Sequence, residues 1–129
     1  MAKRSLFSEK LGRPVAPYCH VAVAGGLGFV SGMLSVDLST GQPVFDDIQS
    51  QTTRILDNMT LLLEDLGWTL KDIAKVTIFL TDMGDFGAVN EVYGRYFADE
   101  PPARSCIQVA ALPLRSEEHT SELQSHHPI

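Results

Sequence analysis

The sequence has few of the residues that would indicate a redox site, a metal site or a nucleophilic active site. Only two cysteines, Cys19 and Cys106, occur in 129 residues, and they lie far apart, so we expect two free thiols in a reducing compartment. His20 is the one histidine before residue 115. No Ser or Cys occurs in a pattern that would pair it, as a nucleophile, with this or another base, so no catalytic triad is predicted. Metal-ligand spacing is absent as well. We therefore expect neither a metal nor a cofactor.

Basic charge is also scarce. Lys and Arg number 10 against 16 Asp and Glu, which gives a net charge of −6 and a pI near 5.0. Because no basic stripe offers the cation density that phosphate binding needs, a nucleic-acid partner is disfavoured. The basic residues near the start are followed by no apolar run, so we predict neither a signal peptide nor a membrane segment. We expect a cytoplasmic protein with one domain and one core, which suits a hydrophobic content of 44%.

Two short apolar segments, at residues 19–24 and 27–31, flank Gly25-Gly26 and predict a β-hairpin. The glycines also invite a nucleotide-loop interpretation. We reject it because no helix follows whose N-terminus could hold a phosphate. Just before the hairpin, Tyr18 is either a packed ring or a hydroxyl directed at a site.

Two helices are predicted further along the chain. Asp46-Asp47 offers an N-cap, apolar residues then recur at helical spacing, and Gly67 ends the helix. The second helix, at about residues 84–97, turns these residues toward one side: Phe86, Val89, Asn90, Tyr93, Tyr96 and Phe97. Asn90 on this apolar side is either a buried amide satisfied by nearby backbone or a ligand contact.

Residues 73–81 and 101–114 predict two more strands. In the first, Phe79 lies among the polar set of the alternation, so we expect the face away from the helices to be covered too, by another subunit. In the second, alternation separates a small apolar set, which we expect to face the helices, from a set that contains Arg104, Cys106 and Gln108. The Arg104 guanidinium could grip a carboxylate through two parallel hydrogen bonds, or it could be only a solvated strand residue.

The order strand, strand, helix, strand, helix, strand predicts an α+β fold with both helices on one face of a mixed sheet. In its motifs and in the spacing between them, the sequence also resembles the Rid family of reactive-intermediate deaminases, or YjgF-like proteins. The resemblance spans residues 13–114 and is carried by these motifs: Val30-Ser31-Gly32, Val76-x-Ile78-Phe79-Leu80-x-Asp82-Met83, Phe86-x-x-Val89-Asn90-x-x-Tyr93-x-x-Tyr96-Phe97 and Pro102-Ala103-Arg104-Ser105-Cys106.

The resemblance implies a homotrimer with a chorismate-mutase-like fold and clefts between subunits. It also implies an activity, the hydrolysis of enamines and imines such as 2-aminoacrylate and 2-iminobutanoate to a 2-oxo acid and ammonia. By the same resemblance, Arg104 would bind the substrate carboxylate, and Cys106 would act through its backbone carbonyl near the substrate nitrogen. The remaining cleft residues would be Tyr18, Ser31, Gly32 and Asn90.

The sequence departs from the family after Leu114. The run from Arg115 to His126 resembles the translated read-through of a sequencing adaptor, so we expect a truncated Rid domain at residues 1–114 and a disordered, non-native tail at 115–129. Family members continue into a final strand carrying a Glu that supports the catalytic water, and neither Glu117 nor Glu118 matches that position. We therefore expect the final strand to be missing and the activity to be impaired.

Two other functions stay open. A non-catalytic trimeric module could hold a small carboxylate for regulation, since Arg104 would serve binding equally well. A rearrangement catalyst of the chorismate-mutase type is suggested by fold analogy alone.

Overall fold

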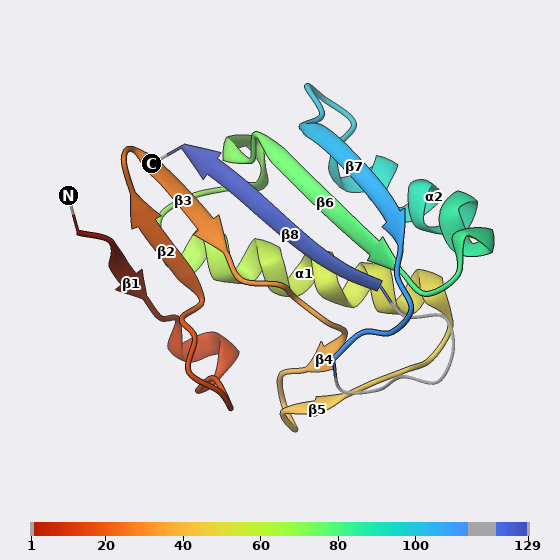
Figure 1. Ribbon diagram of the computed structural model, residues 1–129, viewed down its shortest axis with the longest axis horizontal. Coiled ribbons are helices and arrows are strands. Elements are labelled where there is room, and N and C mark those ends of the chain that lie inside the picture. The colour runs from red at the N-terminus through yellow and green to blue at the C-terminus, as the bar shows by residue number, and fades with distance from the viewer. Residues whose placement is uncertain (1, 114–120, 129) are drawn as a thin grey trace.

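A six-stranded mixed sheet with both helices on one of its faces forms the body of the protein (Figure 1). The computed structural model describes residues 2–113 and 121–128. Its α-helices and strands are β1 (Arg4–Leu6), β2 (Val21–Ala24), β3 (Leu27–Val30), β4 (Val36–Asp37), β5 (Gln42–Pro43), α1 (Ile48–Asp65), β6 (Lys75–Leu80), α2 (Phe86–Tyr96), β7 (Ala103–Gln108) and β8 (Ser121–Pro128). Single 3-10 turns cover Glu9–Leu11, Leu70–Asp72 and Met83–Asp85.

The sheet order is β1-β2-β3-β8-β6-β7, and β4 pairs separately with β5. Only β6 and β7 run parallel, joined by α2, while the other neighbouring strands in this sheet are antiparallel. The predicted α+β class, with two helices on one face of a mixed sheet, is confirmed. The predicted hairpin is also present: Gly25 and Gly26 have φ values of 58° and 76°, the left-handed pair that a tight two-residue turn requires.

Helix α1 begins and ends where its capping residues predict. The Asp47 carboxylate accepts a hydrogen bond from the Ser50 N–H at 3.0 Å, which satisfies one of the open donors of the first turn. At the other end, Gly67 adopts a φ of 96°, and the Trp68 N–H donates to the Leu63 carbonyl at 2.8 Å. This glycine-terminated pattern satisfies the last carbonyls of the helix.

The core lies between α1 and the sheet. Helix α1 contributes Ile55, Leu56, Met59, Leu62 and Leu63, all essentially inaccessible to solvent. Val76, Ile78 and Leu80 of β6 face them, and α2 adds Val89 and Val92. Burial of this apolar surface fixes α1 on the sheet far more strongly than helix propensity could.

The expectation that the final strand is missing is wrong in this structure. Backbone residues Ser121–Pro128 form β8, which inserts antiparallel between β3 and β6, with Phe29 opposite His126 and Ile78 opposite Leu123. The physical reason is that β3 and β6 would otherwise leave backbone donors and acceptors unpaired in the middle of the sheet. The expected domain boundary at 114, together with Glu117 and Glu118, lies outside the described residues, and the non-native origin of the tail stays a prediction.

The assignment of faces on β7 is also wrong. Val76 lies opposite Arg104 and Ile78 opposite Cys106 in the parallel ladder, so Arg104 and Cys106 share the helix-covered side of the sheet. Ile107 lies on the other side and is 46% exposed. Alternation separates two sets of side chains, but only the register with β6 decides which set meets the helices.

The sheet face away from the helices is partly apolar. Leu27 and Phe29 of β3 and Ile107 of β7 are exposed there, and Phe79 of β6 is half-buried. This face is apolar enough to be covered by another copy of the chain, which stays a prediction. Within residues 2–113 and 121–128, neither α1 nor α2 has the length and apolar character of a membrane-spanning helix.

Candidate functional site

Arg104 lies on β7, the strand at one end of the sheet, against one face of α2. Its Nη1 donates to Asn90 Oδ1 at 2.6 Å, and its guanidinium carbon lies 5.4 Å from the centre of the Phe86 ring and 4.9 Å from that of Tyr93. Phe86, Asn90 and Tyr93 reach it together because residues at i, i+4 and i+7 share one face of a helix. We call these three residues the α2 clamp.

The guanidinium is half-buried, and no carboxylate in the described part of the chain forms an ion pair with it. Its neighbours are a neutral amide and two aromatic faces, which orient a cation without neutralising it. Asn90 engages one N–H, and the other N–H groups of the fork have no acceptor in the part of the chain that the structure describes. A half-buried cation without an acid partner is suited to binding an anion, and the planar fork favours a carboxylate or a phosphate.

The Tyr93 hydroxyl next to this cation is buried and has no hydrogen-bond partner among the described residues. Burial raises the pKa of Tyr93 to about 12, against the lowering effect of the Arg104 charge. The hydroxyl therefore stays protonated at neutral pH and cannot neutralise Arg104. Its ring packs on Phe97 with centroids 4.5 Å apart, which fixes its position.

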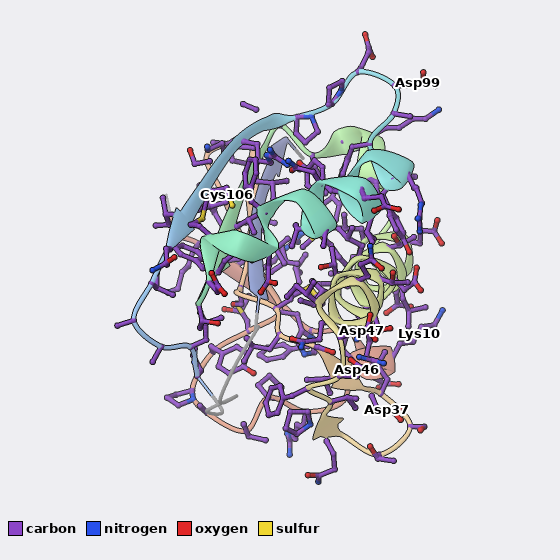
Figure 2. All side chains as sticks on the ribbon, turned by 90° about the vertical axis from the view of Figure 1, so that its right-hand side faces the viewer. Lys10, Asp37, Asp46, Asp47, Asp99 and Cys106 are labelled. Carbon is purple, nitrogen blue, oxygen red and sulfur yellow. The ribbon has the colours of Figure 1, made fainter. Side chains whose placement is uncertain are left out.

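Cys106, two residues along β7, is half-buried beside α2 (Figure 2). Burial raises the pKa of its thiol, with the Arg104 charge opposing the rise, so the thiol is mainly protonated at neutral pH and a poor nucleophile. The backbone of Cys106 points away from β6. Ala103 donates its N–H to the carbonyl of Ala74, just before β6, and Val109 donates to that of Leu80, so by alternation the N–H and C=O of Cys106 point toward the free edge of β7.

The remaining predicted residues lie elsewhere. Tyr18, Cys19 and Ser31 line a groove of about 990 Å³ between the hairpin and the segment that precedes it. Ser31 Oγ donates to the Cys19 carbonyl at 2.6 Å, and the Tyr18 ring is 48% exposed. Gly32 follows Ser31 and is exposed.

One chain therefore does not bring all the predicted residues together. Arg104, Cys106 and Asn90 form one group on β7 and α2, whereas Tyr18, Ser31 and Gly32 form a second group beyond β3. Strands β8 and β6 separate β3 from β7, which at roughly 4.8 Å per strand gives a lateral distance of about 14 Å. A small acid held by one group cannot touch the other within the same chain.

Phe86 and Tyr93 were missed as neighbours of the cation. Their helical spacing with Asn90 placed them on one side of the predicted helix, but it could not show that this side meets Arg104.

The described residues contain no cluster of His, Cys, Asp and Glu suited to a metal ion. The acidic residues Asp37, Asp46 and Asp47 gather near the start of α1, away from Cys106 (Figure 2), and Asp46 forms an ion pair with Arg54 at 2.9 Å.

Comparison with known proteins gives consistent matches. The family model described as Endoribonuclease L-PSP matches residues 9–118. A RutC family protein from Pyrococcus abyssi is 42% identical over 113 residues, which cover 88% of this chain and 89% of that relative. The chloroplastic Reactive Intermediate Deaminase A of Arabidopsis thaliana is 39% identical over 115 residues, 89% of this chain and 62% of the relative. The structure of E. coli TdcF with bound serine superposes with a TM-score of 0.85 at 30% identity and covers 98% of each chain.

Proposed function

The chain belongs to the Rid family, whose family model is described as Endoribonuclease L-PSP, and on that premise we propose that it hydrolyses short-lived imino acids to 2-oxo acids and ammonia. The proposed substrates are 2-iminobutanoate and 2-iminopropanoate, with their enamine forms such as 2-aminoacrylate. One relative is named a reactive intermediate deaminase, and another has serine bound in its structure. A deaminase removes an amino group and serine is a small amino acid, and both are compatible with the class proposed here.

The observation that carries the proposal is the Arg104 guanidinium, half-buried, oriented by Asn90 and without an acid partner among the described residues. A 2-imino acid presents a carboxylate next to its C=N bond. When the guanidinium fork binds that carboxylate, the reacting carbon and nitrogen are held at a fixed place along the edge of β7. The Cys106 carbonyl, which points toward the same edge, would accept a hydrogen bond from the substrate N–H.

The reaction demands little chemistry from side chains. Water adds to the carbon of the C=N bond, the nitrogen gains a proton, and the carbinolamine formed expels ammonia as the C=O bond forms. Because imines already react with water, orientation of the substrate and one water lowers the barrier through proximity. The Cys106 thiol takes no part as a nucleophile, consistent with its raised pKa. We assign no glutamate to the water, and we expect slower turnover than in relatives that carry one.

We further propose that the complete site forms between copies of the chain in a homotrimer. The second group, Tyr18, Ser31 and Gly32, lies too far from Arg104 to act with it in one chain, so a neighbouring copy would supply it. The partly apolar outer face of the sheet, with Leu27 and Phe29 exposed, offers a surface for that assembly.

The test is hydrolysis of 2-iminobutanoate generated by a pyridoxal-phosphate threonine dehydratase, with a nucleophile present that traps the free imine. Purified chain should lower the trapped fraction and increase 2-oxobutanoate, and Arg104→Ala should lose this effect. The alternative, a non-catalytic trimeric module that binds a small carboxylate, predicts binding of 2-oxobutanoate with no change in the trapped fraction. Cleavage of RNA is disfavoured by the net charge of −6.

A further inference from the structure

The contacts around Arg104 raise a question about Asn90. The family resemblance places Asn90 among the residues that would line the substrate cleft, yet its Oδ1 is engaged by Arg104 Nη1 at 2.6 Å. Asn90 is half-buried on α2, with Phe86 one turn before it and Tyr93 one turn after it. Its amide oxygen is thus occupied by the cation itself.

We propose that the α2 clamp is a positioning element for Arg104, in which Asn90 fixes the direction of the guanidinium fork and, being neutral, leaves its charge for the substrate carboxylate. The ligand class in this inference rests on the proposed function.

Orientation follows from the geometry. The guanidinium donates through Nη1 to Asn90, and the centroids of the Tyr93 and Phe86 rings lie 4.9 and 5.4 Å from its carbon. These three contacts restrict both the rotation of the guanidinium and its displacement. The Tyr93 ring is held in turn by Phe97. A fork that is already ordered loses less conformational entropy when it binds a carboxylate through two parallel bonds.

The neutral charge of Asn90 matters as well as the direction of its hydrogen bond. An aspartate at position 90 would have almost the same shape as asparagine and would accept the same bond, but as a carboxylate it would form an ion pair with Arg104. The strong charge-assisted bond would then lie inside the chain, and a substrate carboxylate would meet a neutralised cation and a nearby negative charge. The type of residue at position 90 thus decides whether Arg104 binds an acid from outside.

The experiment measures the dissociation constant of 2-oxobutanoate, the product, by NMR titration, together with KM, kcat and the melting temperature. We expect Asn90→Asp to raise the dissociation constant and KM by roughly tenfold or more, with a melting temperature equal to or above that of wild type. Asn90→Ala should raise both by a smaller factor. A fold defect would instead lower the melting temperature and the fraction of active protein, without a selective rise in the dissociation constant and KM.

The matched control is Asn58→Ala. Asn58 is a buried asparagine on α1 whose Nδ2 donates to the Val36 carbonyl at 2.8 Å, so its removal also costs one amide hydrogen bond. It lies outside the α2 clamp. Asn58→Ala should therefore lower the melting temperature while leaving the dissociation constant of 2-oxobutanoate within about twofold of wild type.

A double-mutant cycle separates positioning from direct contact. In an Arg104→Lys background no planar fork remains to be oriented, so adding Asn90→Ala should change the dissociation constant less than twofold. If Asn90→Ala keeps its full effect in that background, or if Asn90→Asp binds 2-oxobutanoate as tightly as wild type, the inference is overturned. Failure of the proposed function is distinguishable, because wild type would then bind 2-oxobutanoate with the predicted Asn90 dependence but hydrolyse no imine.

Discussion

Replacement of Arg104 by lysine separates the two properties ascribed to the guanidinium, charge and shape. Lysine keeps the positive charge but cannot donate to Asn90 and grip a carboxylate through two parallel bonds at once. One charge-assisted hydrogen bond, worth about 1.5–3 kcal/mol, is lost in the transition state. That corresponds to a fall in kcat/KM for 2-iminobutanoate of roughly 10- to 150-fold. Because Arg104 is half-exposed and makes no ion pair among the described residues, the melting temperature should change little.

The assay is the rate of 2-oxobutanoate formation in competition with a trapping nucleophile, measured for wild type, Arg104→Lys and a control. The control is Arg95→Lys, which alters an exposed arginine also on α2, paired with Glu91 at 3.4 Å on the surface. Surface pairs of this kind contribute little. Arg95→Lys should match wild type. A value of kcat/KM for Arg104→Lys within twofold of wild type would refute the idea that fork geometry, rather than charge alone, binds the substrate.

Further predictions concern β8, Tyr93 and Cys106. Leu123→Pro should lower the free energy of unfolding by about 3 kcal/mol, because proline breaks the β8 ladder opposite Ile78, and an unchanged denaturation midpoint would contradict a central β8. Tyr93→Phe should raise the free energy of unfolding by about 1 kcal/mol at pH 7, because it removes a buried unpaired hydroxyl; a lower melting temperature would argue against the observed environment. The pKa of Tyr93 is raised to about 12 in the folded protein, against a value near 10 in the unfolded chain. The free energy of unfolding should therefore fall as the pH rises from about 10 to 12, because the unfolded chain loses the Tyr93 proton first. Tyr93→Phe should show a smaller fall over the same pH range. Finally, iodoacetamide at pH 8 should alkylate Cys106 more slowly than a free cysteine, because its pKa is raised; mass spectrometry showing equal rates would contradict this.

Local sequence signals were sufficient for the helices and the hairpin. Asp47 marks the start of α1 and Gly67 its end, through side-chain and backbone hydrogen bonds that involve only neighbouring residues. Gly25 and Gly26 permit a turn that few other residues tolerate. Such features depend on short stretches of chain, so the residues themselves predict them.

Features that depend on distant pairing were harder to predict. The alternation on β7 gave two correct sets of side chains, but the set containing Arg104 faces the helices because Val76 lies beside it in the ladder. Strand β8 was missed because its residues are mostly polar and not β-branched; its place follows from the gap between β3 and β6. The separation of Tyr18 from Arg104 likewise follows from the sheet order, which no single motif encodes.

The most direct test of the proposed activity is the lifetime of free 2-iminobutanoate with and without the purified protein. We predict that the wild-type chain shortens this lifetime in proportion to its concentration, with ammonia and 2-oxobutanoate formed in equal amounts, and that Arg104→Ala abolishes the effect. An unchanged lifetime at a protein concentration that binds 2-oxobutanoate would contradict the proposed hydrolysis and favour a binding module instead.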